Sequence, residues 1–499
     1  MHTLINRTAI SMALLALAGA AAAQDHAAHG ATPPAAAAIP AATPATTAAT
    51  TAATTPPAEE MTGMEGMDMS DHAHHQMDKP AADAAPAAAE HAGHAMPGMD
   101  HARPMAGAFG QYPMTREASG TSWQPESTTL DGIHQMNGPW MTMYHGFINT
   151  VYDHQGGPRG ANLAFSESML MAMASRPLGN GTLGLRAMVS LDPVIGKRGY
   201  PLLFQTGETA DGHNALVDRQ HPHDLLMELS ASYSYNLGAD SSVFVYAGLP
   251  GEPALGPPAF MHRASGMDNP EAPLTHHWLD STHITFGVVT AGYIWRAFKL
   301  EASSFNGHEP DQFRWNVETR KLDSASARLS WNPSPDWSLQ VSHGRLDSPE
   351  SLEPDVIVHR TTASAMYQQT IAGMPTQTTL AWGRNRHEPG TTTNGYLLES
   401  SMRVRPDTTV FGRFEAVQNG ELFGHGHGAD ETPASALQDR VYNIKKLSVG
   451  VVHDFVQLGP VKFGVGAVAS AFAKPAALDT VYGDSPSAWM LFFRARLAM

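Results

Sequence analysis

The sequence contains no cysteine, few charged residues and, beyond its first residues, no long apolar run. Without cysteine the chain forms neither a disulfide framework nor a thiolate zinc site. Charged residues make up 16% of the chain, against about 25% in typical soluble domains. No stretch after residue 23 reaches the roughly 18 apolar residues of a transmembrane helix. The net charge of −16 argues against a nucleic-acid partner.

The first residues are typical of a secretory signal. One Arg precedes a short apolar core, and small residues follow, with Ala21 and Ala23 in the Ala-x-Ala pattern before Gln24. Residues 1–23 are therefore predicted to be a signal peptide, too short to anchor the chain in a membrane. Export carries the mature chain to an oxidising compartment, where metal capture without thiols is chemically coherent.

Residues 24–128 are predicted to form a disordered arm. Ala, Pro and Thr dominate its first part, and Ala and Pro return near residues 80–89. Such a composition buries too little apolar surface to offset the entropy of the chain.

The middle of this arm is rich in two kinds of metal ligand. Between Met61 and Met105 the chain places eight methionines and six histidines among Ala, Gly, Pro and Asp. A thioether suits Cu(I), whereas imidazole suits Cu(II), zinc and nickel. The arm is therefore predicted to bind copper, as Cu(I) or Cu(II), with zinc and nickel as alternatives, and an incidental compositional bias is the other interpretation. The predicted ligands in the arm are Met61, Met64, Met67, Met69, His72, His74, His75, Met77, His91, His94, Met96, Met99 and His101.

Residues 129–499 show a different pattern, in which apolar and polar residues alternate. Leu183, Leu185, Ala187 and Val189 alternate with polar or small neighbours, and the segment from Trp489 to Leu497 does the same. A period of two is typical of membrane β-strands with one apolar and one polar face, although a soluble β-sandwich also produces it.

The spacing of the segments favours a barrel over a sandwich. Tight connections, at 176–177, 237–239, 296–297, 333–335 and 406–407, mostly alternate with long ones, as in outer-membrane barrels. The fold class is therefore all-β: a transmembrane antiparallel outer-membrane barrel of about sixteen strands, with fourteen to eighteen compatible with the pattern. The predicted strands are 138–152, 161–175, 181–192, 223–237, 241–250, 282–295, 298–306, 321–332, 336–345, 356–372, 375–386, 394–405, 408–419, 439–456, 460–473 and 485–498.

Histidines also gather in the predicted long loops. His221 and His223, if on a strand, would share a face and could bind one ion with a further ligand, and Asp224 could orient a ring. His276 and His277, in the next long loop, are proposed partners. We favour the simpler interpretation, in which these loop histidines pack and form hydrogen bonds, and keep metal binding as the alternative. His425 and His427 lie in a later loop.

Methionines recur on the first two predicted strands. Met141, Met143 and His145 share one face of the first strand, and Met169, Met171 and Met173 share one face of the second with Glu167. If Glu167 faces the lumen, the methionines do so too and could conduct Cu(I) along the wall. We favour the alternative that they are apolar filler on a lipid face or in packing gaps.

Charged residues within the predicted strands are expected to face the lumen or the rim, because charges are costly toward lipid. They are Arg186, Glu228, Glu301, Arg328, Arg345, Arg384, Arg403, Arg405, Arg413, Glu415, Arg494 and Arg496. The motifs G-x-S-x-G and H-E-x-x-H and a phosphate loop do not occur, so no enzymatic activity is predicted.

The chain resembles the outer-membrane copper-resistance proteins, the B component of copper-resistance operons. The resemblance lies in the signal peptide, in the Met/His-rich segment with pieces such as Met99-Asp100-His101, and in the C-terminal barrel. The barrel region is larger than is usual in that family. The resemblance implies periplasmic copper binding, and traffic or sequestration of copper at the outer membrane.

The sequence thus predicts an outer-membrane protein of a Gram-negative bacterium, with its arm in the periplasm. The arm would bind copper and support its efflux, sequestration or passage. A general diffusion porin or substrate channel with an incidental arm is one alternative, and a non-conducting scaffold for periplasmic metal-handling proteins is another. Expected partners are outer-membrane lipid, metal ions, the barrel-assembly machinery and periplasmic copper-handling proteins; the oligomeric state stays open.

Overall fold

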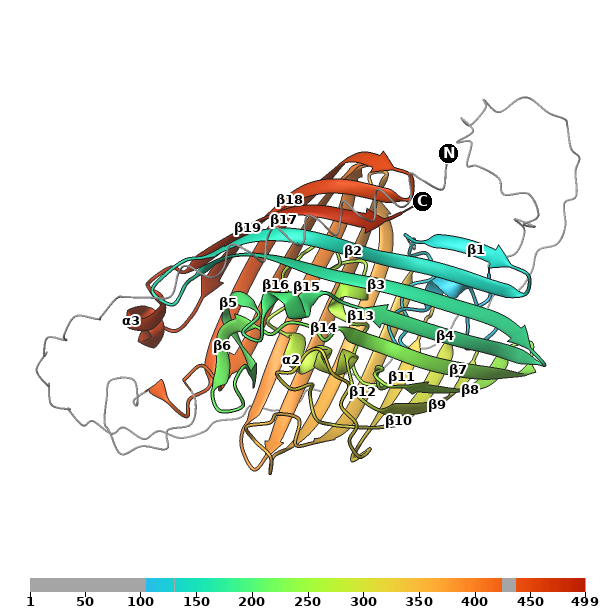
Figure 1. Ribbon diagram of the computed structural model, residues 1–499, viewed down its shortest axis with the longest axis horizontal. Coiled ribbons are helices and arrows are strands. Elements are labelled where there is room, and N and C mark those ends of the chain that lie inside the picture. The colour runs from blue at the N-terminus through green and yellow to red at the C-terminus, as the bar shows by residue number, and fades with distance from the viewer. Residues whose placement is uncertain (1–104, 130, 424–436, 499) are drawn as a thin grey trace, which may run out of the picture. The chain divides into compact units, whose positions relative to one another are not determined.

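The computed structural model describes residues 105–129, 131–423 and 437–498. Within them, sixteen antiparallel strands form a closed barrel, in which β19 pairs with β2 (Figure 1). A short additional strand, β1 (Ile133–Asn137), pairs with the first residues of β2. The barrel strands are β2 (Trp140–Gln155), β3 (Asn162–Leu178), β4 (Gly181–Val189), β7 (Leu226–Gly238), β8 (Ser241–Gly248), β9 (Val288–Trp295), β10 (Phe298–Phe305), β11 (Ser324–Trp331), β12 (Trp337–Asp347), β13 (Ile357–Ile371), β14 (Met374–Glu388), β15 (Thr392–Arg405), β16 (Thr408–Asn419), β17 (Tyr442–Leu458), β18 (Val461–Ala473) and β19 (Ser487–Leu497).

The predicted barrel of sixteen strands is confirmed, with two local corrections. The turn expected at 176–177 is wrong, because Pro177 still pairs with Thr182 and the chain turns at Gly179, whose φ is +59°. The strand expected to begin at 282 begins instead at Val288, because residues 281–283 form a 3₁₀ turn.

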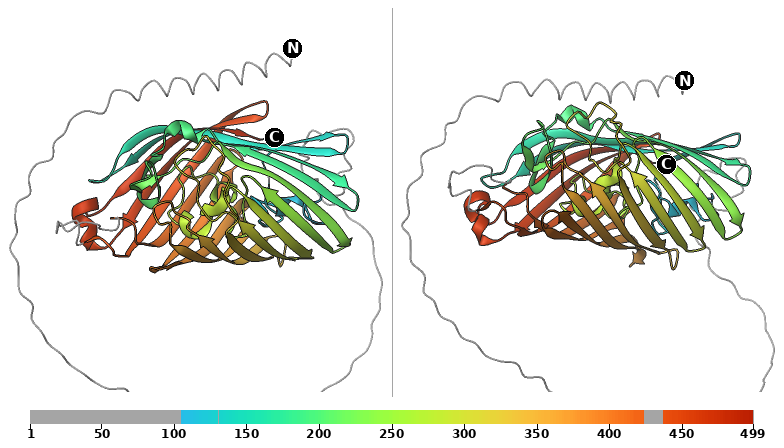
Figure 2. Two further views of the ribbon diagram at one scale, coloured as in Figure 1. Left: turned by 60° about the horizontal axis from the view of Figure 1, so that its bottom comes forward. Right: turned by 90° about the horizontal axis from the view of Figure 1, so that it is seen from below.

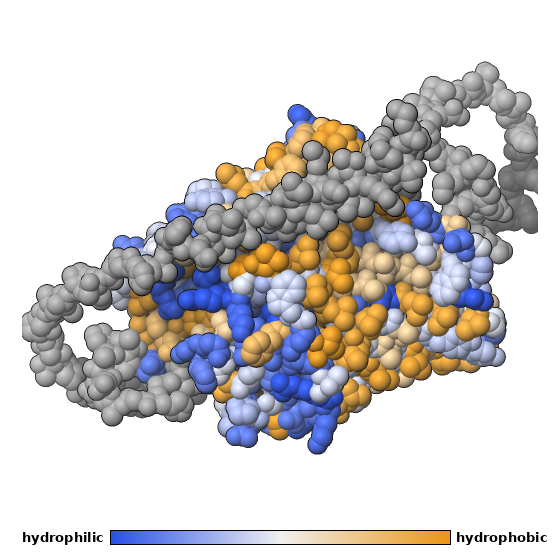
Figure 3. Space-filling model, viewed as in Figure 1, coloured by the Kyte–Doolittle hydropathy of each residue, from blue (hydrophilic) through white to orange (hydrophobic). Residues whose placement is uncertain are grey.

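The outer face of the barrel is apolar. On β19, Trp489, Leu491 and Phe493 are exposed, whereas the alternate residues Met490 and Phe492 are buried. Figure 3 shows hydrophobic residues over much of the outer face near β3, β4 and β7. Closure satisfies the backbone groups of every barrel strand, and the outward side chains suit a lipid environment. The protein is an outer-membrane β-barrel.

The helical elements are short. They are η1 (Met114–Arg116), η2 (Asp192–Ile195), η3 (Phe260–His262), α2 (His276–Leu279), η4 (Ser281–His283), η6 (Ala476–Leu478) and α3 (Asp479–Tyr482). In the part of the chain that the structure describes, no helix has both the length and the apolar character to cross a membrane.

Three segments fill the barrel lumen (Figures 1 and 2). The first, here called the plug, is residues 105–128, which precede the barrel. The second, the lumen hairpin, pairs β5 (Tyr200–Thr209) with β6 (Ala215–Gln220) between β4 and β7. The third, the lumen loop, is residues 249–287 between β8 and β9, and nearly all of it is buried. The lumen hairpin and the lumen loop belong to long connections between strands. In outer-membrane barrels, long connections lie at the extracellular end.

The plug differs from the prediction that residues 24–128 are disordered, because residues 105–128 are packed inside the barrel. Phe109 and Trp123 are 1% and 3% exposed and belong to one apolar cluster with wall residues such as Phe244. Arg328 and Lys299 on the wall donate hydrogen bonds to Thr121. The aromatic residues of this segment find apolar partners only in the lumen, so its own composition does not reveal the packing.

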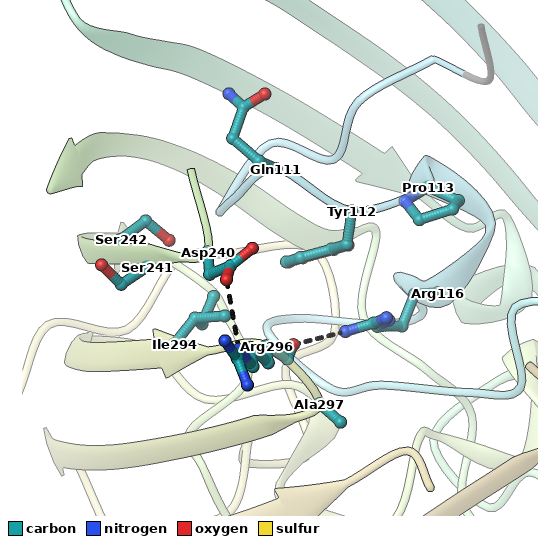
Figure 4. Close-up of a pocket in the computed structure, with 10 residues that line it drawn as sticks. All are labelled: Gln111, Tyr112, Pro113, Arg116, Asp240, Ser241, Ser242, Ile294, Arg296 and Ala297. Atoms are coloured by element: carbon teal, nitrogen blue, oxygen red, sulfur yellow. Dashed lines mark hydrogen bonds and ion pairs between the residues drawn. The ribbon is translucent and has the colours of Figure 1, made fainter. Parts of the chain in front are cut away.

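The plug leaves a hollow at the rim with the tight turns. A cavity of about 320 Å³ lies between plug residues Tyr112 and Arg116 and the turns at Asp240 and Arg296 (Figure 4). Arg116 Nη1 donates to the carbonyl oxygen of Arg296 across this rim at 3.1 Å. The plug is therefore packed closely around Trp123 and attached more loosely at the rim.

Buried ion pairs attach the lumen loop to the wall. Arg263 bonds Asp280 of its own loop at 2.6 Å and Glu399 of β15 at 2.7 Å. Lys446 of β17 contacts loop residue Glu271 at 2.5 Å. Seven of the strand charges expected to face the lumen or rim are buried: Arg186, Glu228, Glu301, Arg328, Arg413, Glu415 and Arg494. Arg186, Arg328, Arg413, Glu415 and Arg494 bind the filling segments directly rather than lining an open channel.

Gly383 allows α2 of the lumen loop to approach the wall. A Cβ at Gly383 would lie 2.2 Å from the carbonyl oxygen of Trp278, so G383A is expected to weaken docking of the loop by about 1–3 kcal/mol. Faster cleavage by chymotrypsin after Trp278 would measure this. G412A is the matched control, because its Cβ would meet only the Ser448 oxygen at 3.4 Å. Equal cleavage of the two variants would contradict the argument.

Candidate metal site in the barrel lumen

The lumen loop and the end of the lumen hairpin bring five histidines together. This histidine cluster consists of His221, His223, His276, His277 and His283. Its ring centroids follow one another at 5.4 Å from His277 to His276, 5.1 Å from His276 to His283, and 5.4 Å from His283 to His223. His221 lies beside this row, 6.2 Å from His276 and 6.0 Å from His277.

Oxygen atoms fix the orientation of three of these rings through Nδ1. His223 Nδ1 lies 2.8 Å from Asp192 Oδ2, and His276 Nδ1 lies 2.8 Å from Asp280 Oδ1. His283 Nδ1 donates to the carbonyl oxygen of Asp280 at 2.8 Å. A proton held on Nδ1 leaves the Nε2 lone pair free, which is the state of a metal-binding imidazole supported from outside its coordination shell.

Burial keeps His221, His277 and His283 neutral at pH 7. It lowers the pKa of His277 to about 4, and it holds the pKa values of His221 and His283 well below the usual range. Burial alone would raise the pKa of Asp280, but the charge of Arg263 and the hydrogen bond from His276 outweigh it and lower that pKa. The Nε2 atoms of His277 and His283 are buried and have no hydrogen-bond partner.

The cluster is a row rather than one closed site. Within residues 105–129, 131–423 and 437–498, no three His, Asp or Glu side chains are arranged to hold a metal ion together. Two neighbouring rings in the row could each supply one nitrogen ligand to the same ion. The arrangement therefore suits ions that move along the row or that bind further ligands.

The expectation that His221 and His223 share a strand face is wrong, because β6 ends at Gln220. His221 instead faces His276 and His277, as the proposed pairing of the two loops predicted, and His223 faces His283. Asp224 does not orient a ring: its carboxylate pairs with Arg314 at 3.1 Å.

A second group of ligands lines a small cavity between the plug and strands β2 and β3. This methionine cavity, of about 70 Å³, is lined by Met114, Met143, Met171, Met173, Met267, His145 and His262, among others. Glu167 is 9% exposed and faces the lumen together with Met169 and Met171. The favoured interpretation of these methionines as lipid-facing filler is therefore wrong for β3. Met169 and Met171 belong to the apolar core and Met173 packs against it, so the other half of that interpretation, packing inside the protein, holds.

Two smaller cavities share lining residues with the methionine cavity. One shares Met267 with it and is also lined by His223, Met261 and Asp192. The other shares Met143 and Met173 with it and extends to Met141. Thioether and imidazole groups therefore follow one another along the inside of the wall, from the histidine cluster to the start of β2.

Several of these ligands were not singled out from the sequence as metal ligands. His262 and His283 stand in the long loop that also carries His276, so the loop's histidine content was the available signal. Met114 and Met267 stand alone in their segments, and only the tertiary structure brings them to the cavity. The predicted ligands of the arm, Met61 to His101, and His425 and His427 lie outside the described residues.

Comparison with models of known families gives no match, and no curated protein matches the chain. Among solved structures, the chain is similar to OmpT, an outer membrane protein of Vibrio cholerae, with a TM-score of 0.42 and 9% identity over 73% of this chain and 99% of that one. It is similar to an anion-selective porin from Comamonas acidovorans (TM-score 0.43, 10% identity, 72% and 100% covered). The outer membrane channel DcaP of Acinetobacter baumannii is also similar (TM-score 0.42, 10% identity, 74% and 100% covered).

Proposed function

We propose that this outer-membrane barrel binds copper ions and holds them in its lumen or passes them across the membrane. In this proposal the Met/His-rich arm collects the ions in the periplasm and raises their concentration at the barrel through tethering. The observation that carries the proposal is the succession of thioether and imidazole groups from Met141 to His277. Thioethers bind Cu(I), and imidazoles bind copper in both oxidation states.

The filled lumen also supports this function over general diffusion. A sixteen-stranded barrel is wide enough for an aqueous channel when its interior is empty. Here the plug, the lumen hairpin and the lumen loop occupy the interior, and buried ion pairs such as Arg263–Glu399 hold the loop there. Passage along a wall of ligands needs less open space than diffusion of hydrated solutes.

Copper entry into liposomes tests the proposal. The full-length protein is reconstituted, copper is added with or without a reductant, and a trapped copper chelator reports entry while liposome swelling reports sugar entry. Loss of even an outer-shell partner typically costs 10–100-fold in metal affinity. The triple variant H223Q/H276Q/H283Q is therefore expected to lower copper entry or retention at least about tenfold without raising sugar entry.

The matched control is H343Q/H359Q. These two rings also lie 6.0 Å apart, but His343 is exposed on the wall rather than buried in the lumen. Copper and sugar entering equally well in all variants would indicate a diffusion porin and contradict the proposal. If the protein neither binds copper nor lets it enter the liposomes, the proposal is contradicted, and the alternative of a non-conducting scaffold remains.

A further inference from the structure

The methionine cavity brings ligands that suit soft metals together from two adjacent strands. On adjacent strands β2 and β3, Met143 lies directly opposite Met173, and His145 lies directly opposite Met171. Directly opposed residues of antiparallel strands have Cβ atoms about 4.5–5.5 Å apart. Two cross-strand pairs, two residues apart along each strand, therefore present three thioethers and one imidazole to the same face of the wall.

The imidazoles at this cavity have free ring nitrogens. His145 Nδ1 donates to the carbonyl oxygen of Asp131 at 2.9 Å, which leaves Nε2 as an acceptor. His262, from the lumen loop, has a buried Nε2 without a hydrogen-bond partner, and its ring centroid lies 6.2 Å from that of His145. A bound ion would give these unused nitrogen lone pairs a partner.

The carboxylates at the cavity edge are already engaged. Glu117 accepts hydrogen bonds from the Phe109 amide and the Tyr112 hydroxyl, and it lies 3.6 Å from Arg186. Asp131 is paired with Arg496 at 2.7 Å. The free ligands are thus neutral sulfur and nitrogen atoms, a set that favours a monovalent soft ion over Zn²⁺ or Cu²⁺.

From this geometry we infer that the methionine cavity is a Cu(I)-binding site, with Met143, Met171, Met173 and an imidazole of His145 or His262 as ligands. Met114 of the plug and Met267 of the lumen loop also line the cavity. The inference rests on the proposed copper function and deepens it, because it names the oxidation state and the place in the lumen where the ion is held.

Silver(I) binding to the full-length protein tests the site, because Ag(I) is a stable soft monovalent probe. With ¹³C-methyl methionine labels, the Met143 and Met171 resonances are expected to shift on addition of Ag(I). M143L/M171L is expected to bind one equivalent fewer, and Met-to-Leu changes are volume-conserving and well tolerated. M169L is the matched control, because Met169 is on the same face of β3 but does not line the cavity.

The outcomes separate this inference from the proposed function. Unshifted Met143 and Met171 resonances, with shifts confined to methionines of the arm, would overturn the site while leaving copper binding by the arm intact. An equal loss of Ag(I) in M169L and M143L/M171L would also overturn it. Site-specific shifts in a protein that shows no copper entry or retention would support the site and contradict the proposed function.

Discussion

Replacing Arg263 by methionine is expected to release the lumen loop from the barrel wall. The Arg263 side chain is fully buried and bonds both Asp280 and Glu399. R263M leaves the buried Asp280 without its cation and leaves Glu399 with Arg413 as its remaining cation, and breaking a buried pair in this way costs about 3–5 kcal/mol. Chymotrypsin added outside intact cells is expected to cleave rapidly after Phe260 and Trp278. In planar bilayers, the ionic conductance of the variant is expected to rise.

R345M is the control for this prediction. Arg345 pairs with Asp347 at 2.8 Å, but its side chain is 42% exposed, and exposed pairs contribute only about 0–1 kcal/mol. Cleavage and conductance of R345M should therefore match those of the unchanged protein. If R263M were as resistant to protease as R345M, the ion pairs would not be what holds the loop in the lumen.

Replacing Trp123 by alanine is expected to release the plug from the other end of the lumen. Trp123 packs edge-on against Tyr112 at 5.3 Å, and the Lys299 ammonium lies 4.7 Å from the centre of its ring. Truncation of a buried Trp costs about 3–5 kcal/mol. Since each 1.4 kcal/mol is a factor of about ten, the released fraction should rise about a hundredfold or more. Trypsin cleavage at Arg116 in the detergent-solubilised protein measures it.

W315A provides the comparison, because Trp315 is 59% exposed in a loop and surface changes usually stay within about 0.5 kcal/mol. Conductance should rise in W123A and stay unchanged in W315A. A W123A protein whose Arg116 resists trypsin as before would show that the hydrogen bonds to Thr121, rather than the aromatic cluster, hold the plug.

The strands of this protein could be read from the sequence because their signal is local. On β19 each alternate residue faces lipid, so Trp489, Leu491 and Phe493 had to be apolar whatever the rest of the chain did. Loop lengths, alternately short and long, added the closure into sixteen strands. Mid-strand charges such as Glu301 and Arg328 could be assigned to the lumen because lipid would not accept them.

The filling of the lumen could not be read in this way. Residues 105–128 follow an Ala- and Pro-rich arm without an obvious boundary, and Trp123 is buried only because Lys299, Arg116 and Tyr112 surround it. The lumen loop is polar and Pro-rich, as exposed loops are, yet its charges are satisfied by Glu399 and Lys446 on distant strands.

The sequence by itself thus determined the membrane barrel, its approximate number of strands and its high content of methionine and histidine. Only the tertiary structure decided which of these ligands meet. His223 and His283 are 60 residues apart in the sequence and 5.4 Å apart in space, and Met143 faces Met173 through a cross-strand register. Alternation is a property of neighbouring residues and is written locally, whereas a ligand cluster in a lumen depends on the packing of segments that no local pattern relates.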